Sequence, residues 1–145
     1  MATARPSRIF SLMSDLQCPA TILLMARESI ASGGPVILEA RHLSGVFVAS
    51  AVAADPGGLA ATARLAEEGA WRLTTMPDVS DGASLARAIE ELADLHRGET
   101  IAVVGTRDMI QDLLGEASVG ADPITIAVDD SGWFVSPGGR HAREG

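Results

Sequence analysis

Three continuous apolar runs of strand length constrain the fold of this chain more than any other feature. They read TILLM at 21–25, VFVAS at 46–50 and IAVVG at 101–105, and stretches with helical spacing lie between them. An apolar run without polar alternation is typical of a parallel strand that is covered on both faces. The sequence therefore predicts an α/β protein of three layers, with a mostly parallel sheet and helices on both faces.

Three helices are predicted from capping residues and periodicity. The first begins at Asp55, where a capping carboxylate precedes a proline. The second begins near Asp81 and ends at 96–98, where two basic side chains at the negative helix end precede a glycine. The third begins after Thr106 and ends at Gly115 or Gly120. The residues expected to face the core are Leu59, Thr62, Ala63 and Ala66, then Leu85, Ala88, Ile89, Leu92 and Leu95, and finally Met109, Ile110, Leu113 and Leu114.

The remaining segments set the domain boundaries. WRLTTM at 71–76 alternates like an edge strand, and ITIAV and WFVS flank the turn sequence DDSG, which predicts a C-terminal antiparallel hairpin. Residues 20–136 are expected to form one domain, and 137–145 a flexible tail. Residues 1–19 form an N-terminal extension, in which a short predicted helix would pack on the domain or on a second subunit. Its apolar side would consist of Ile9, Phe10, Leu12, Met13 and Leu16.

Charge and cysteine usage exclude several classes of partner. The net charge is −8 and all eleven basic residues are arginines, so nucleic acid and anionic membrane surfaces are not expected to bind. The sequence has neither a signal peptide nor an apolar run of membrane-spanning length. The lone Cys18 has no CxxC or Cys/His cluster around it, which favours a reducing cytoplasm and argues against structural zinc. We therefore predict a cytoplasmic, acidic protein with no metal and no cofactor.

The order of elements resembles the small members of the histidine phosphatase superfamily, which have the phosphoglycerate mutase-like fold. Local matches cover about residues 20–136. TILLMARES stands where the family has a strand running into RHGE, and TIAVVGTRDMIQDLLG stands where it has a strand, Ser-His-Gly and a helix. VASAVAADPGGLAATARLAEE matches the family's strand, serine-rich turn and helix, MPDVSDG its acidic loop, and ITIAVDDSGWFVS its closing hairpin.

The resemblance implies a degenerate member, because the catalytic histidines are missing. Family enzymes attack phosphate with a histidine at the end of the first strand and hold its oxygens with arginines and a second histidine. Here Arg27 stands in the place of the nucleophile and Thr106 in that of the second histidine, while 57–59 replaces an expected arginine. The resemblance therefore predicts a pseudoenzyme that is not a phosphatase.

The same resemblance places a candidate pocket at the ends of the first, second and fourth strands. Two readings stay open: ion pairs of Arg27 with Asp108 and of Glu28 with Arg107 close the cleft, or the residues form a rebuilt site. No catalytic residue is assigned. The pocket residues are Arg27, Glu28, Ser29, Ser50, Asp55, Thr106, Arg107 and Asp108.

The histidines that remain are not expected to take over catalysis. His96, in the sequence HRGET, reads as a helix end, His42 as a surface residue of the connection 31–45, and His141 as part of the tail. That connection is shorter than in the family, where a full helix joins the first two strands. One wall of the pocket therefore differs from the family pattern.

Three functions are open at this point. The first is a catalytically silent domain that binds a small anionic ligand or a protein partner. The second is a repurposed enzyme, such as a lyase, isomerase or cyclase, that uses arginine and carboxylate side chains in the former phosphate pocket. The third is a structural or assembly subunit, with a homodimer formed through the N-terminal segment.

Overall fold

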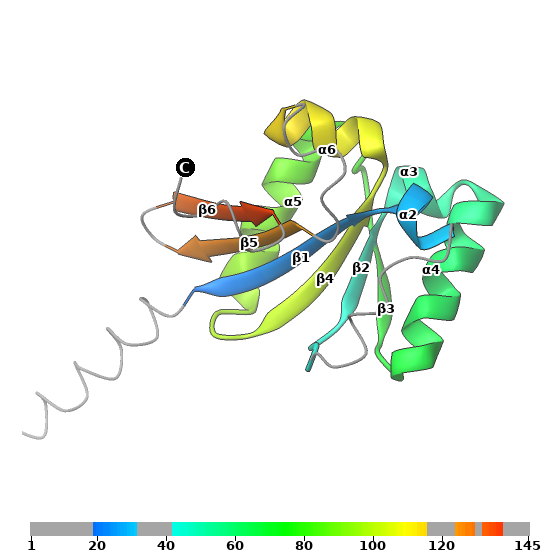
Figure 1. The fold of residues 1–145 in the computed structure, drawn as a ribbon, viewed down its shortest axis with the longest axis horizontal. Coiled ribbons are helices and arrows are strands. Elements are labelled where there is room, and N and C mark those ends of the chain that lie inside the picture. Colours follow the sequence, from blue (N-terminus) through cyan, green and yellow to red (C-terminus); the bar gives the residue numbers. More distant parts are fainter. Residues whose placement is uncertain (1–18, 32–41, 116–123, 130–131, 138–145) are drawn as a thin grey trace, which may run out of the picture.

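The computed structural model describes residues 19–31, 42–115, 124–129 and 132–137. Within these ranges the strands are β1 (Ala20–Ala26), β2 (Val46–Ala49), β3 (Leu73–Met76), β4 (Thr100–Gly105), β5 (Ile124–Asp129) and β6 (Gly132–Pro137). The helices are α2 (Arg27–Ala31), α3 (Ser50–Ala53), α4 (Pro56–Gly69), α5 (Gly82–Leu95) and α6 (Arg107–Leu114). The strands form one mixed sheet in the order β3-β2-β4-β1-β5-β6 (Figure 1).

The first and fourth strands lie side by side at the centre of the sheet. β1 and β4 run parallel, from Thr21 opposite Thr100 to Ala26 opposite Gly105. β2 and β3 continue the parallel part of the sheet, whereas β5 is antiparallel to both β1 and β6. The structure thus confirms the mostly parallel sheet, the edge strand at 71–76 and the closing hairpin.

The helices cover the two faces of the sheet because the crossovers run in opposite directions. The chain passes from β2 through α4 to β3 at the edge, and returns from β3 through α5 to β4. Right-handed crossovers in opposite directions place α4 and α5 on opposite faces. Figure 1 shows α6 beside α5, and α2 and α3 beside α4, which agrees with the helix contacts.

The core is aliphatic, as the low aromatic content requires. All eight residues of Ile22–Met25 and Ile101–Val104 are fully buried, as are Leu85 and Ile89 of α5. Two expected core residues are exceptions: Leu95 is 74% exposed and Leu59 is 39% exposed. Leu95 is the last residue of α5, and the buried side of the helix follows Leu85, Ile89 and Ala93, so that Leu95 points away from it.

The predicted helix starts agree with the structure. The side chain of Asp55 caps α4 and that of Thr106 caps α6. Asp81 caps α5 in a capping box with Ser84. The backbone N–H of Ser84, and then its hydroxyl, donate to the Asp81 carboxylate, and these hydrogen bonds hold its pKa below the usual value.

Several predictions concern residues outside the described ranges. They are the N-terminal helix, the environment of Cys18, the connection at 32–41, the turn at 130–131, and the tail at 138–145 with His141. The boundaries of the domain at 20 and 136 remain predictions. The third helix ends at Leu114 and Gly115 is its C-cap, which agrees with the earlier of its two expected ends.

Candidate functional site

Most predicted pocket residues lie at the carboxyl ends of the parallel strands. Arg27 follows β1 as the first residue of α2, Ser50 follows β2 as the first residue of α3, and Thr106 follows β4 as the cap of α6. Since β1, β2 and β4 are parallel and belong to one sheet, their carboxyl ends lie next to one another. Open α/β sheets bind their ligands at the carboxyl ends of their strands.

Arg27 forms ion pairs with two carboxylates of its own chain. Its Nη1 lies 3.0 Å from Oδ2 of Asp55, and its Nε lies 3.9 Å from Oε2 of Glu28. The expected pair with Asp108 was wrong, because α2 packs against α4 and this contact brings the cap residue Asp55 within reach. The three side chains are between 33% and 46% exposed, so the pairs contribute little to stability, about 0–1 kcal/mol each.

Glu28 also contacts α6, although not in the expected way. Its Oε1 accepts a hydrogen bond of 3.0 Å from the backbone N–H of Arg107, whereas an ion pair with the Arg107 guanidinium was expected. Arg107 is the first residue of α6, so the carboxylate lies at the positive end of that helix. A second backbone amide of this helix end is bound by Thr106, whose Oγ1 accepts a hydrogen bond of 3.2 Å from the N–H of Met109.

Asp55 has the corresponding role at α4. Its Oδ2 accepts a hydrogen bond of 2.9 Å from the backbone N–H of Gly58, in addition to the contact with Arg27. A Cβ atom at Gly58 would lie 3.1 Å from Cδ of Arg27 and 3.0 Å from the carbonyl oxygen of Val52. The sequence of 57–59 indicated only the loss of an arginine, and the room that Gly58 leaves for Arg27 was not predicted.

Ser50 holds the loop that follows β3. Its hydroxyl donates to the carbonyl oxygen of Val79 at 3.1 Å and accepts from the N–H of Val79 at 2.9 Å. A similar link joins α6 to α5, since Oδ2 of Asp112 accepts from the N–H of Gly82 at 3.0 Å. Val79 and Asp112 were missed because no local pattern marks a residue whose partner is some 30 positions away. Ser50 therefore has a structural role.

The other predicted pocket residues are more exposed. Ser29 is half-buried in α2, while Arg107 and Asp108 are exposed in the first turn of α6. Within the described ranges, neither the guanidinium of Arg107 nor the carboxylate of Asp108 forms an ion pair. The site at these strand ends thus contains two arginine side chains and three carboxylates, so its negative charge exceeds its positive charge. They are Arg27 and Arg107, and Glu28, Asp55 and Asp108.

Both histidines in the described part of the chain lie near the amino end of β4, away from the candidate pocket. His96 is the C-cap of α5 before β4 begins, and its Nδ1 lies 2.8 Å from Oε1 of Glu99. The hydrogen bond with His96 is the main reason why the pKa of Glu99 is lowered. His42 lies two residues before Ser44, whose N–H donates to the carbonyl oxygen of Thr100 at the start of β4. The interpretation of HRGET as a helix end is confirmed.

The described residues contain neither a metal-binding cluster nor a membrane-spanning helix. No group of three histidine, cysteine, aspartate or glutamate side chains could hold a metal ion there. No helix among them has both the length and the apolar character needed to cross a membrane.

Comparison with known proteins places the fold. No protein-family model matches the sequence, and no curated protein matches it. Among solved structures, the chain is similar to a phosphoglycerate mutase from Plasmodium falciparum, with a TM-score of 0.56 and 14% sequence identity over 82% of this chain and 89% of that one.

This likeness confirms the fold that the order of elements in the sequence predicted. The protein has a phosphoglycerate mutase-like α/β fold, with a mixed sheet that is mostly parallel and an antiparallel β5–β6 hairpin. At such low identity, the likeness carries no statement about activity. What the site does must be argued from its own residues.

Proposed function

We propose that this protein is a catalytically silent protein of the histidine-phosphatase-like fold that acts by binding a protein partner at the carboxyl ends of β1 and β4. The observation that supports the proposal is that carboxylates of the chain itself occupy the groups that would hold a phosphate. Asp55 is bound to Arg27 and to the first turn of α4, and Glu28 is bound to the first turn of α6.

Charge supports the absence of phosphoryl transfer. A phosphoryl group in transfer carries several negative oxygens, which a catalytic site must surround with positive charge. Here Arg27 is paired with Asp55, and Glu28 takes up a helix amide that would otherwise face an anion. A phosphate ester would have to displace both carboxylates. Arg27 also cannot act as the nucleophile, because its guanidinium is always protonated.

The exposed residues around this edge suit a protein partner. Leu59 is 39% exposed in the first turn of α4, directly after Gly58, whose backbone N–H binds Asp55. Arg107 and Asp108 are exposed in the first turn of α6. An apolar side chain and charges of both signs that are exposed at the same ends of the strands suit a small interaction surface, in which arginine is enriched.

A small anionic ligand is the second candidate, and one observation favours it. The guanidinium of Arg107 forms no ion pair with any described residue, and it lies at the positive end of α6. A carboxylate or phosphate could bind there without displacing Asp55. The nearby Asp108 would weaken this contact by charge repulsion.

The two other functions have less support. A repurposed enzyme would need a free acid or base, but Glu28 and Asp55 already accept hydrogen bonds from backbone amides and contact Arg27. Only the exposed Asp108 of α6 then stays available among the three carboxylates. The structural subunit depends on residues 1–18, which lie outside the described ranges. A cytoplasmic location and a homodimer through that segment remain predictions.

A site-specific cross-linker tests the proposed surface. With a photoreactive amino acid in place of Arg107, irradiation in the native cell should join the protein to one recurring partner. The matched control carries the same amino acid in place of Arg64, an exposed arginine in the middle of α4. We expect the cross-link at 107 and none at 64, and Leu59→Asp should reduce it. Cross-linking of equal extent at both positions, or no partner at 107, would refute the proposal.

A further inference from the structure

One outer strand of the sheet carries none of the features that usually prevent pairing with another chain. The strand order β3-β2-β4-β1-β5-β6 leaves β3 and β6 on the outside (Figure 1). Proteins protect an outer strand by making it short, by charged side chains or proline, or by a bulge. β3 is only four residues long, and its central residues Thr74 and Thr75 are polar and exposed. β6 is longer and lacks such protection.

The sequence and pairing of β6 leave a regular, uncharged outer side. Its sequence GWFVSP at 132–137 contains no charged residue, and its one proline is the last residue. It pairs with β5 from Gly132 opposite Asp129 to Pro137 opposite Ile124 without a change of register, so no bulge interrupts it. A further strand could therefore add to β6 along most of its length.

The pairing with β5 also determines which backbone groups of β6 point outward. Only two residues separate Asp129 from Gly132, and the residues that close so short a hairpin exchange their backbone hydrogen bonds. Bonded and non-bonded pairs alternate along an antiparallel ladder, so the N–H and C=O groups of Trp133 and Val135 point away from β5. Within the described ranges these outward groups have no hydrogen-bond partner.

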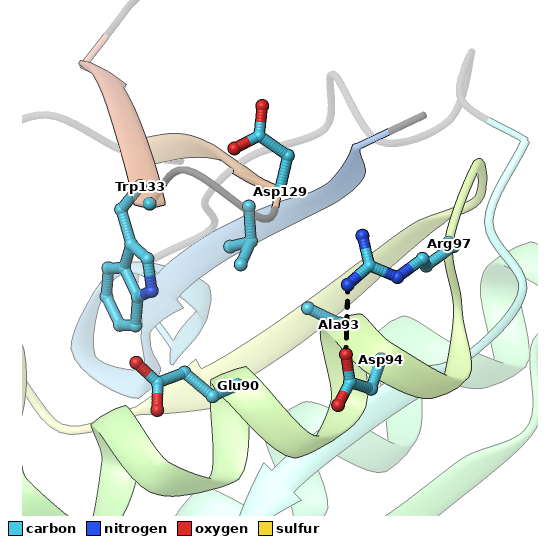
Figure 2. Close-up of a pocket in the computed structure, with 8 residues that line it drawn as sticks. Glu90, Ala93, Asp94, Arg97, Asp129 and Trp133 are labelled. Carbon is cyan, nitrogen blue, oxygen red and sulfur yellow. Dashed lines mark hydrogen bonds and ion pairs between the residues drawn. The ribbon is translucent and has the colours of Figure 1, made fainter. Parts of the chain in front are cut away.

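The two faces of β6 are covered to different extents. Trp133 and Val135 lie on the face of α5 and pack against the core, and the indole of Trp133 lines a cavity together with Glu90 of that helix (Figure 2). Phe134 points to the other face, because successive side chains of a strand alternate, and it is 55% exposed. Its cross-strand neighbour there is the small Ala127. An incompletely covered ring thus stands between the two residues with unpaired backbone groups.

Charge and symmetry favour a second copy of the same chain as the partner of β6. The net charge is −8, so a contact between two copies is favoured where the facing surfaces carry no charge, and β6 provides such a surface. The outward groups are also self-complementary, because Trp133 and Val135 flank Phe134 symmetrically. A two-fold axis beside Phe134 brings Trp133 of one copy opposite Val135 of the other.

We propose that the protein forms a symmetric dimer in which the β6 strands of two copies pair antiparallel and join the two sheets into one. Trp133 of each copy exchanges backbone hydrogen bonds with Val135 of the other. The two Phe134 side chains lie opposite each other beside the axis and shield each other from water. This contact is independent of the partner surface proposed above, which lies at the carboxyl ends of β1 and β4, and of residues 1–18.

Disulfide trapping tests the proposed register. Opposite residues of a non-bonded antiparallel pair have Cα atoms about 4.5 Å apart, a distance that a disulfide can span. In a Cys18→Ser background, Phe134→Cys should therefore form a covalent dimer under mild oxidation, seen on a non-reducing gel. The matched control is Thr74→Cys, at an exposed position of the other outer strand. No covalent dimer from Phe134→Cys, or as much from Thr74→Cys, would overturn the proposal.

Sedimentation equilibrium of the natural chain measures the dimer without a cross-link. One strand pair buries little surface, so we expect a dissociation constant between about 1 μM and about 1 mM. Phe134→Lys should weaken the dimer at least about tenfold, because two like charges would face each other beside the axis. This substitution lowers the net negative charge of the chain, so general repulsion between copies cannot explain the loss.

Leu95→Lys is the matched control, because it places the same charge at another exposed apolar residue, at the end of α5. Its dimer should stay within about twofold of the parent in affinity. Leu12→Asp tests residues 1–18 as the alternative contact and should also have no effect. A monomer at every concentration, or equal weakening by Phe134→Lys and Leu95→Lys, would overturn the proposal. Loss of the dimer on Leu12→Asp would overturn it too, because it would assign the contact to the N-terminal segment.

Discussion

Replacement of Leu24 by alanine is expected to lower the free energy of unfolding by about 2–5 kcal/mol. Leu24 is fully buried in the centre of β1, opposite Val103 of β4 and Ile124 of β5. Its truncation would leave a cavity where the parallel and antiparallel parts of the sheet meet, and neighbours with paired backbones cannot move in to fill it. Urea unfolding followed by circular dichroism measures the change.

The same substitution at Leu95 is the control. Periodicity predicts that Leu95 faces the core, but its side chain is 74% exposed at the end of α5. Leu95→Ala should therefore change the free energy of unfolding by no more than about 0.5 kcal/mol. If both variants lose a similar amount of stability, or if Leu95→Ala is the more damaging one, the packing described for α5 is wrong.

Asp55→Asn is expected to create an anion site that the natural chain lacks. The amide can still accept the hydrogen bond from Gly58 and so cap α4, since asparagine caps helices about as well as aspartate. Arg27, however, loses the carboxylate that lies 3.0 Å from its guanidinium. Tungstate, a phosphate mimic, should then bind at least about tenfold more tightly than to the parent, because opposite charges near a protein surface attract by several kcal/mol before screening.

Two further variants show whether the gain arises at Arg27. Glu68→Gln removes the same charge at the far end of α4 and should leave tungstate affinity unchanged. Asp55→Asn combined with Arg27→Gln should lose the gained affinity. Calorimetric titration measures all four proteins. The idea that Asp55 blocks an anion site fails if Asp55→Asn binds no more tightly than Glu68→Gln, or if the gain survives without Arg27.

Much of the fold follows from local sequence signals. The runs at 21–25 and 101–105 predict buried parallel strands because uninterrupted apolar residues need cover on both faces, and the structure pairs these strands in register. Helix starts at Asp55, Asp81 and Thr106 could be predicted because a cap depends on residues only three positions away. The prediction for Leu95 was wrong because more than one helical spacing fits the apolar residues of α5, and the buried side follows Leu85, Ile89 and Ala93.

The candidate site was harder to predict. The strand ends that carry Arg27, Ser50 and Thr106 follow from the order of elements, but the contact of Arg27 with Asp55 depends on how closely α2 approaches α4. Side-chain geometry across a sheet edge is a tertiary property, which no spacing in the sequence encodes. For the same reason no pattern indicated the cavity between Glu90 and Trp133, whose walls come from elements some 40 residues apart.

Turnover of phosphate monoesters tests the central claim most directly. The purified protein is incubated with p-nitrophenyl phosphate and a panel of sugar phosphates, and released phosphate is measured beside the Glu28→Gln and Asp108→Asn variants. We predict that the natural protein releases no phosphate above the level of these variants, since its own carboxylates occupy the groups that a phosphate would need. Turnover by the natural protein that disappears in either variant would contradict the account, because it would identify a carboxylate that has taken over the catalytic role.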